Sequence, residues 1–294
     1  MWAVVVTHRR LELLRACLDA LGAQRRAPEH VLVVDNASGD GTVEAVRAEH
    51  PEVEVLGLPT NEGGAGGFHE GLGRAVAGGA EWVWLMDDDT IPQPDALQAL
   101  LDAPGRLPAD EPTPVLLASR AVWDEGALHP MNAPGFERDS PERVVRSARV
   151  GLMPIRTATF VSLLVHRDAV ARHGLPHKHF FIWSDDIEYT ARVLRHDRGY
   201  VVPTSVVHHR TKTPYTAVSS TGGRFYYHVR NSLYMIRGDA WSGREKLTVA
   251  WLLLTTSIAY LRHHRFAATA IATVGRGLRD GVRPLSQVSA PREG

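Results

Sequence analysis

The sequence has little cysteine and no long apolar run. Its single cysteine, Cys17, excludes a disulfide framework and a metal site built on several thiolates. The opening segment MWAVVVTHRR is too short an apolar run for a secretory signal and is followed by charge, so we expect a cytoplasmic protein. The longest uncharged stretch near the C-terminus, the 15 residues Leu247–Leu261, is shorter than the ~20 residues that span a bilayer.

The chain also lacks an excess of charge of either sign. Its 294 residues include 33 basic and 33 acidic side chains, with no basic patch interleaved with aromatic residues, so we expect no nucleic-acid partner. Hydrophobic residues make up 44%, which is typical of a globular protein with a sizeable core and excludes a disordered or collagen-like chain. Charge is uneven along the chain, because the part from Trp241 onward has eight Lys or Arg against three Asp or Glu.

Short β-branched runs alternate with helical patterns in the first half of the chain. This alternation is typical of an α/β fold with a mostly parallel sheet. The predicted strands of this half are Val4–Thr7, Val31–Asp35, Val53–Leu58 and Glu81–Met86. The predicted helices between them are Leu11–Gln24, Gly41–His50 and Phe68–Ala77.

The second half is less regular. Proline, glycine and charge are frequent over Leu101–Pro154, which predicts a long irregular excursion. Regular structure is predicted again at Thr157–His166, with a helix over Asp185–His196 and a strand over Tyr200–Val207. We therefore expect an α/β domain over 1–222, a helical region over 223–280 and a disordered tail over 281–294.

Polar residues follow the first two predicted strands. Because parallel α/β sheets bind ligands at the carboxyl ends of their strands, Thr7 and Arg9 are candidates for ligand contacts. Asp35 ends the second strand, and its carboxylate could accept hydrogen bonds from a base or a ribose. The alternative is an Asx turn that only ends the strand.

The segment NEGGAGGFHEG has four glycines in five positions just before a predicted helix. Backbone without side chains can approach a ligand closely and point its N–H groups at phosphate or sugar oxygens. The alternative is a flexible surface turn. The segment is neither a Walker A loop nor a G-x-G-x-x-G that follows the first strand, which argues against P-loop NTPases and Rossmann dehydrogenases.

Three consecutive carboxylates, Asp87, Asp88 and Asp89, follow a predicted buried strand in WVWLMDDDT. Like charges this close raise one another's pKa unless a cation lies among them. A hard divalent ion, Mg²⁺ or Mn²⁺, is the natural partner for such oxygens. A solvated acidic turn is the alternative.

Two further polar clusters come later in the chain. In FFIWSDDIEY, Asp185 and Asp186 would lie in the first turn of a helix with Ser184 as its N-cap, where the helix dipole favours carboxylates. Alternatively, an aspartate beside aromatic surface can act as general base on a bound hydroxyl. His208 and His209 end a strand in VVHHRTKT, where either could ligate the same ion or only form ordinary hydrogen bonds.

Taken in order, the strings VVVTHRR, VVDNASGDGT, NEGGAGGF, WVWLMDDDT, FFIWSDDIEY, VVHH and RFYYHVRN resemble family 2 glycosyltransferases of GT-A fold. The resemblance covers about Met1 to Arg237. It is closest to bacterial galactofuranosyltransferases of the type that initiates actinobacterial galactan synthesis. The first 222 residues would accordingly form a GT-A catalytic domain, followed by a helical extension.

The resemblance implies roles for individual residues. Contacts to the nucleotide sugar would come from Thr7, Arg9, Asp35, Asn61, Gly63, Gly64, Gly66, Gly67, Asp87 and Asp88. The metal ligands would be Asp87, Asp89 and His208, which the preceding valines favour over His209. Asp186 would be the catalytic base. Acceptor contacts would come from Trp183, Asp185, His209, Arg224, Tyr227 and Arg230, although helix packing is an equal alternative for the last three.

The implied activity is that of an inverting glycosyltransferase that requires Mn²⁺ or Mg²⁺. The expected donor is UDP-galactofuranose and the expected acceptor is a hydroxyl of a glycan or a polyprenyl-diphosphate-linked sugar in cell-surface polysaccharide synthesis. The alternatives are a rhamnosyltransferase that uses dTDP-rhamnose and an inactive nucleotide-sugar-binding scaffold. A nucleotidyltransferase is disfavoured, because no basic glycine-rich loop follows the first strand.

The segment after Gly222 allows two interpretations. Its aromatic residues Trp241, Trp251 and Tyr260, flanked by basic residues, could lie on the anionic inner face of the cell membrane. Equally, the apolar stripe could pack on the catalytic domain or on a sister subunit. Peripheral membrane contact and homo-oligomerisation are therefore both open expectations.

Overall fold

The computed structural model describes residues 1–123, 126–138, 140–211, 218 and 223–283. One ten-stranded sheet has the order β3-β2-β1-β4-β9-β6-β10-β8-β7, with β5 paired to β10. The strands are β1 (Trp2–Thr7), β2 (His30–Asp35), β3 (Glu54–Gly57), β4 (Trp82–Asp87), β5 (Thr90–Pro92), β6 (Leu116–Val122), β7 (Gly135–Phe136), β8 (Met153–Thr157), β9 (Leu163–His166) and β10 (Gly199–His209).

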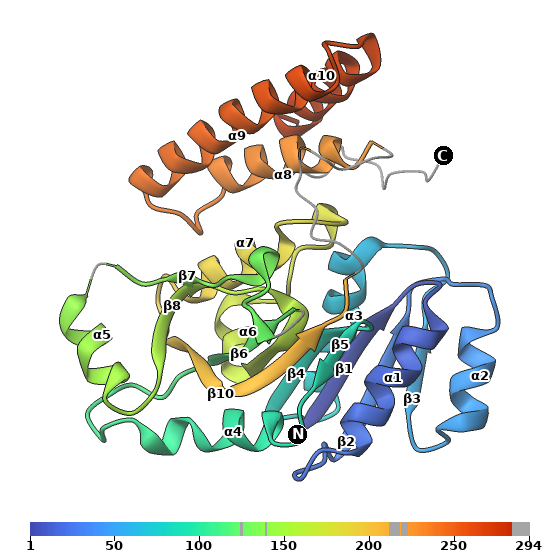
Figure 1. The fold of residues 1–294 in the computed structure, drawn as a ribbon, viewed down its shortest axis with the longest axis vertical. Coiled ribbons are helices and arrows are strands. Elements are labelled where there is room, and N and C mark those ends of the chain that lie inside the picture. The colour runs from blue at the N-terminus through green and yellow to red at the C-terminus, as the bar shows by residue number, and fades with distance from the viewer. Residues whose placement is uncertain (124–125, 139, 212–217, 219–222, 284–294) are drawn as a thin grey trace.

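Helices cover both faces of this sheet (Figure 1). The α-helices are α1 (Leu11–Gly22), α2 (Thr42–Glu49), α3 (Gly63–Ala77), α4 (Ala96–Asp102), α5 (Pro141–Ala148), α6 (Arg167–His173), α7 (Asp185–Val193), α8 (Phe225–Arg237), α9 (Gly243–His263) and α10 (Ala268–Gly281). Short 3₁₀ turns are η1 (Pro104–Arg106), η3 (Pro130–Asn132), η4 (Phe160–Ser162) and η5 (Lys178–Phe180).

The sheet is buried because β1, β2 and β4 carry apolar side chains on both faces. Val4 and Val6 of β1 face α3 and α7, whereas Ala3 and Val5 face α1, α2 and α4. Strands β2 and β4 both pair with β1 in parallel, so their carboxyl ends meet at one edge. The α/β fold expected from the first half of the chain is confirmed.

The prediction of an irregular excursion over Leu101–Pro154 is wrong. Strand β6 lies inside this segment and pairs with β9 on one side and, in parallel, with β10 on the other. Its pattern is weak in the sequence because Pro114 precedes it closely and the polar pair Ser119 and Arg120 interrupts its apolar run. The strand is stabilised by its neighbours in the sheet, which local periodicity does not reveal.

Helix α3 begins at Gly63 rather than at Phe68, so the glycine run forms the first turns of the helix. A Cβ atom at Gly67 would overlap Val6 Cγ1, and one at Gly71 would overlap Val4 Cγ1. The absent side chains therefore let α3 pack closely against β1.

The three C-terminal helices form a layer beside the α/β part, with α8 between that part and α9 (Figure 1). Phe225 and Val229 of α8 share a core with Tyr260 of α9 and Ala270 of α10. The helices expected after Gly222 are thus present. The tail was predicted over 281–294, but Gly281 still belongs to α10, and residues 284–294 lie outside the described part of the chain. None of the helices in the described ranges is both long and apolar enough to cross a membrane.

Candidate active site

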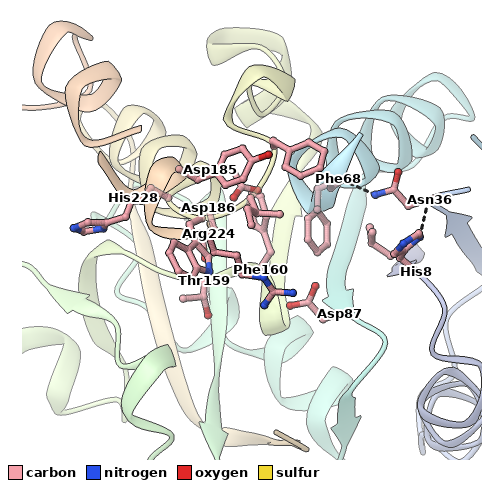
Figure 2. A pocket seen from close by; sticks show the side chains of 18 of the residues that line it. His8, Asn36, Phe68, Asp87, Thr159, Phe160, Asp185, Asp186, Arg224 and His228 are labelled. Carbon is pink, nitrogen blue, oxygen red and sulfur yellow. Dashed lines mark hydrogen bonds between the residues drawn. The ribbon is translucent and has the colours of Figure 1, made fainter. Parts of the chain in front are cut away.

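A cavity of about 1160 Å³ opens at the carboxyl ends of β1, β2 and β4. Its walls come from these strand ends, the start of α3, the segment 181–187, and helices α8 and α10. In Figure 2, Asp87 lies between His8 and Asn36 on one side and Asp185 and Asp186 on the other. Strand ends that are distant in the sequence therefore line the same cavity.

Asp87, Asp89 and His209 form a cluster whose potential ligand atoms all lie within 4.8 Å of one another. Strand β5 brings them together, because Thr90, next to Asp89, pairs with His209 at the end of β10. His209 Nε2 lies 3.1 Å from Asp89 Oδ1. Two carboxylates and one imidazole are a donor set that suits Mn²⁺ and also admits Mg²⁺.

Asn132, which we did not predict, orients the imidazole of His209. His209 Nδ1 donates to Asn132 Oδ1 at 2.7 Å. In this arrangement Nδ1 carries a hydrogen, and the other ring nitrogen, Nε2, faces Asp89. Nε2 has a lone pair when the imidazole is neutral and a proton when it is charged. The lone-pair form is the one that ligates a metal, and such partners of metal-binding histidines tune affinity. The residues present therefore fit a divalent cation.

The geometry corrects our choice of His208 as the metal-ligating histidine. Neighbouring residues of a strand point to opposite faces, so His208 points away from Asp87 and Asp89. Its Nε2 instead lies 3.2 Å from Gln93 Nε2, which can donate to it. His209, which we had placed among the acceptor contacts, is the histidine in the cluster.

The three aspartates have different surroundings. Thr7 Oγ1 donates to Asp88 Oδ2 at 2.8 Å, yet burial raises the pKa of Asp88 to about 6. Burial and the adjacent carboxylates raise the pKa of Asp87 well above its usual range. Burial also opposes the ionisation of Asp89, but its bond with His209 and nearby positive charge outweigh that effect and lower its pKa. A cation here would relieve the repulsion.

Arg10 supplies part of that positive charge, although we had selected Arg9. Arg10 Nη1 lies 3.3 Å from Asp88 Oδ1 and 2.9 Å from Asp89 Oδ2. Arg9 has a φ of 55° and its Nε donates to the carbonyl of Ser38 at 3.0 Å. Nothing in the string THRR distinguishes the two arginines, because the turn after β1 decides which one faces the aspartates.

The predicted nucleotide contacts divide into two groups. Thr7, Asn61, Gly63 and Gly64 line the cavity, as do Asp87 and Asp88. The other four, which are Arg9, Asp35, Gly66 and Gly67, are not among the lining residues.

The residues of the second group have structural contacts instead. Asp35 Oδ2 accepts from the amide of Ser38 at 3.1 Å, as expected for a turn that ends a strand. Gly66 and Gly67 lie inside α3, where a Cβ would overlap Glu62 and Val6 respectively. Helix packing thus explains these two glycines better than contact with a ligand.

Asn36 and His8 also line the cavity, although the sequence analysis gave neither of them a role. Asn36 Nδ2 donates to the carbonyl of Gly63, and its Oδ1 accepts from the amide of Glu62, both at 2.8 Å. His8 Nδ1 lies 2.8 Å from the carbonyl of Asn36 (Figure 2). Asn36 therefore holds the start of α3 beside the carboxyl end of β2. Its place directly after Asp35 was the one available signal.

Asp185 and Asp186 begin α7 and face the cavity (Figure 2). Burial raises the pKa of Asp186 to about 6, even though Asp186 Oδ1 accepts from the amide of Ile187 at 2.7 Å. Burial and the charge of Asp186 raise the pKa of Asp185 well above its usual range. Such a carboxylate is a good proton acceptor near neutral pH. Ser184 does not cap the helix as expected, because its φ is 65° and its side chain makes no capping bond.

Five of the six predicted acceptor contacts line the cavity, namely Trp183, Asp185, His209, Arg224 and Tyr227. Arg230 does not, because it is completely buried and its Nη2 donates to the carbonyls of His179 at 2.7 Å and Phe180 at 2.8 Å. This finding corrects our assignment of Arg230.

Helix α10 adds Arg276 and Arg279 to the cavity wall, which we did not predict. Arg276 lies over the ring of Tyr226, with its guanidinium carbon 5.8 Å from the ring centroid. No linear motif joins α10 to the strand ends, so only the packing of α10 on α8 reveals these arginines.

Comparisons of sequence place this chain among transferases. The profile described as "Glycosyl transferase family 2" matches residues 2–164. The chain is 35% identical over 210 residues to galactofuranosyltransferase GlfT1 of Mycobacterium tuberculosis, a match that spans 66% of this chain and 64% of that protein, just under two thirds of its length. It is 25% identical over 276 residues to the N-acetylglucosaminyl-diphospho-decaprenol L-rhamnosyltransferase of the same species, covering 85% of this chain and 88% of that one.

Comparisons of structure agree on the fold. S. aureus TarS 1-349 in complex with UDP-GlcNAc superposes with a TM-score of 0.61 at 17% identity, covering 95% of this chain and 80% of that one. The mannosyltransferase PcManGT from Pyrobaculum calidifontis, in complex with GDP-Man and Mn²⁺, has a TM-score of 0.52 at 19% identity, covering 97% and 76%. At these identities the likeness concerns the GT-A architecture.

Proposed function

This chain belongs to glycosyl transferase family 2, and on that premise we propose that it moves a sugar from a nucleoside diphosphate to a hydroxyl acceptor with inversion. One observation carries the proposal. The cation-compatible cluster of Asp87, Asp89 and His209 lines the same cavity as the buried carboxylate of Asp186. A leaving-group site and a proton acceptor are the two parts that a single displacement needs.

In this mechanism Asp87, Asp89 and His209 would hold Mn²⁺ or Mg²⁺, whose charge would stabilise the departing diphosphate. Asp186 accepts the proton of the acceptor hydroxyl as that oxygen attacks the anomeric carbon. The C–O bond to the diphosphate breaks in the same step, so the configuration at that carbon inverts. Arg10 holds Asp88 and Asp89 in place through its ion pairs.

UDP-galactofuranose is the proposed donor. Support comes from the galactofuranosyltransferase relative and from a structural neighbour that was solved with UDP-GlcNAc. The rhamnosyltransferase relative keeps dTDP-rhamnose as the second candidate.

The proposed acceptor is a sugar linked to a polyprenyl diphosphate. Arg224 and Arg276 line the cavity and have no carboxylate partner among the residues described. Arg279, also in the wall, pairs with Asp280 at 3.0 Å. Guanidinium groups bind phosphate oxygens well, so this edge suits an anionic acceptor.

Peripheral contact with a membrane is also proposed, and the outer face of α9 supports it. Leu247, Trp251, Leu254 and Ile258 are all exposed, with Leu247 at 73% and Trp251 at 64%, and their spacing places them in one stripe. Basic residues flank this stripe at both ends of the helix, namely Arg244, Lys246, Arg262 and Arg265. Apolar and basic groups together suit an anionic lipid surface at the inner face of the cell membrane.

Vesicle binding distinguishes this contact from a homo-oligomer. We expect the protein to sediment with vesicles that contain phosphatidylglycerol and to leave pure phosphatidylcholine vesicles unbound. Trp251→Ser should weaken the binding because it removes the largest apolar side chain of the stripe. If the protein binds neither kind of vesicle and forms a dimer that Trp251→Ser disrupts, the stripe is a subunit interface instead.

Calorimetric titration with UDP and with dTDP, each with and without Mn²⁺, tests the donor and the cation together. We expect UDP to bind in preference to dTDP and only when Mn²⁺ is present. A preference for dTDP would make rhamnose the donor sugar. If neither nucleotide binds in either condition, the proposed function fails.

A further inference from the structure

The segment directly before the acidic pair has an unusual backbone. Phe181, Trp183 and Ser184 have φ angles of 65°, 67° and 65°, and none of them is glycine. Side chains other than glycine rarely adopt this region, and such conformations persist only where the surrounding structure holds them. Because α7 begins at Asp185, the backbone angles of Ser184 set the direction in which its first turn leaves the segment.

One side chain of α8 holds this segment. Asn231 is completely buried, and its Nδ2 lies within hydrogen-bond distance of three main-chain carbonyls, those of Phe180 at 3.0 Å, Ile182 at 2.9 Å and Trp183 at 2.8 Å, so that its two N–H groups are shared among them. Asn231 Oδ1 accepts from Arg230 Nε at 3.0 Å, which fixes the amide with its N–H groups toward the segment. The amide group of Asn231 thus gives hydrogen bonds to main-chain carbonyls that lie outside the regular pattern of a helix or a sheet.

Arg230, next to Asn231 on α8, also holds this segment. Besides bonding the carbonyls of His179 and Phe180, its guanidinium carbon lies 5.0 Å from the ring centroid of Tyr227 and 5.3 Å from that of Tyr234. Among the described residues, this buried cation contacts oxygens of carbonyl and amide groups and aromatic faces, and these stabilise its charge.

The opposite side of the segment rests on α3. The amide of Ala65 donates to the carbonyl of Phe181 at 3.1 Å. Gly63 has a φ of 70°, and a Cβ atom there would overlap the same carbonyl. The segment is therefore held between the start of α3, which lines the cavity, and the interior of α8.

We propose that Asn231, supported by Arg230, is a positioning residue that holds the segment 180–184 and thereby places Asp186 opposite the cation site. Asn231 does not line the cavity, so it acts only through this backbone. The C-terminal helices would then do more than close the cavity, since they set the geometry of the proton acceptor. The inference rests on the proposed function for the role of Asp186. Whether Asn231 holds the segment 180–184 can be tested without measuring transfer.

The first test measures hydrogen exchange. Asn231→Leu keeps the size of the side chain and removes its donors. Val229→Ala is a matched control, because Val229 is fully buried on the same helix and packs in a core with Leu253, Tyr260 and Ala270. We expect amides of residues 178–187 to exchange at least about tenfold faster in Asn231→Leu than in Val229→Ala. Equal exchange in the two variants would overturn the proposal, even if the wild-type protein transfers no sugar.

The second test measures transfer. We expect kcat to fall about 100-fold in Asn231→Leu, with the KM for the donor changed less than about threefold, because only the acceptor side of the reaction is misplaced. Val229→Ala should stay within about threefold of wild type in kcat. If exchange rises in Asn231→Leu but kcat does not fall, the segment does not position Asp186 and the proposal is wrong. Asn231→Ser, which keeps one donor, replaces Asn231→Leu if the latter does not fold.

Discussion

The two ends of the cavity are built in different ways. At the cation end, Asp87 and His209 stand on strands β4 and β10 of one sheet, and their neighbours are fixed by strand pairing. At the acceptor end, the walls come from α7, α8 and α10 and from a backbone segment with positive φ angles. The comparison suggests a division of tasks. Under the proposed function, the end built on paired strands would hold the diphosphate of the donor, and the end built on helices would bind the acceptor.

The largest expected effect concerns the proton acceptor. Asp186→Asn should lower kcat by about 10³-fold, because the amide keeps the shape of the carboxylate and cannot accept the proton. Binding of UDP with Mn²⁺ should be unchanged, since Asp186 belongs to the other end of the cavity. Undiminished transfer in this variant would show that Asp186 is not the base.

The two adjacent histidines offer a matched pair at the cation end. His209→Ala should weaken Mn²⁺ binding by at least about tenfold, and His208→Ala should leave it unchanged, because only His209 lies with Asp87 and Asp89. Calorimetric titration with Mn²⁺ and UDP measures both variants. If His208→Ala weakened Mn²⁺ binding and His209→Ala did not, His208 would be the metal ligand.

The pH dependence of transfer follows from the acceptor end. Burial raises the pKa of Asp186 to about 6, so the carboxyl is protonated below that pH and cannot accept a proton. We expect kcat to fall by about tenfold for each pH unit below 6 and to level off above it. Binding of UDP measured over the same range provides the control. A kcat that stays flat from pH 5 to pH 8 would contradict a base with this pKa.

Stability distinguishes two of the four glycines in the run before Phe68, namely Gly64 and Gly67. Gly67→Ala should lower the free energy of unfolding by about 1–3 kcal/mol, because its Cβ would overlap Val6 Cγ1 where α3 packs on β1. Gly64→Ala should not destabilise the protein, since its Cβ would meet only Phe68 Cε2 at 4.0 Å. Thermal unfolding of the two variants measures the difference. Equal losses would mean that the glycines are not required for packing.

Much of the fold could be predicted because its signals are local. The strands that end in Thr7, Asp35 and Asp87 appear as apolar runs, and both acidic clusters appear as consecutive letters. Strand β6 could not be predicted in this way, because its partners β9 and β10 lie far along the chain. The same holds for Arg276, which reaches the cavity only through the packing of α10.

The sequence by itself determined the α/β architecture, the carboxylates at the strand ends and the family, because periodicity, burial and short motifs are properties of neighbouring residues. Only the tertiary structure decided that His209 and not His208 meets Asp89, and that Arg230 is buried while Arg224 faces the cavity. The physical reason is common to these cases. The register of β5 on β10 and the rotation of α8 about its axis are set by contacts between distant segments, and one residue of shift moves a side chain to another face.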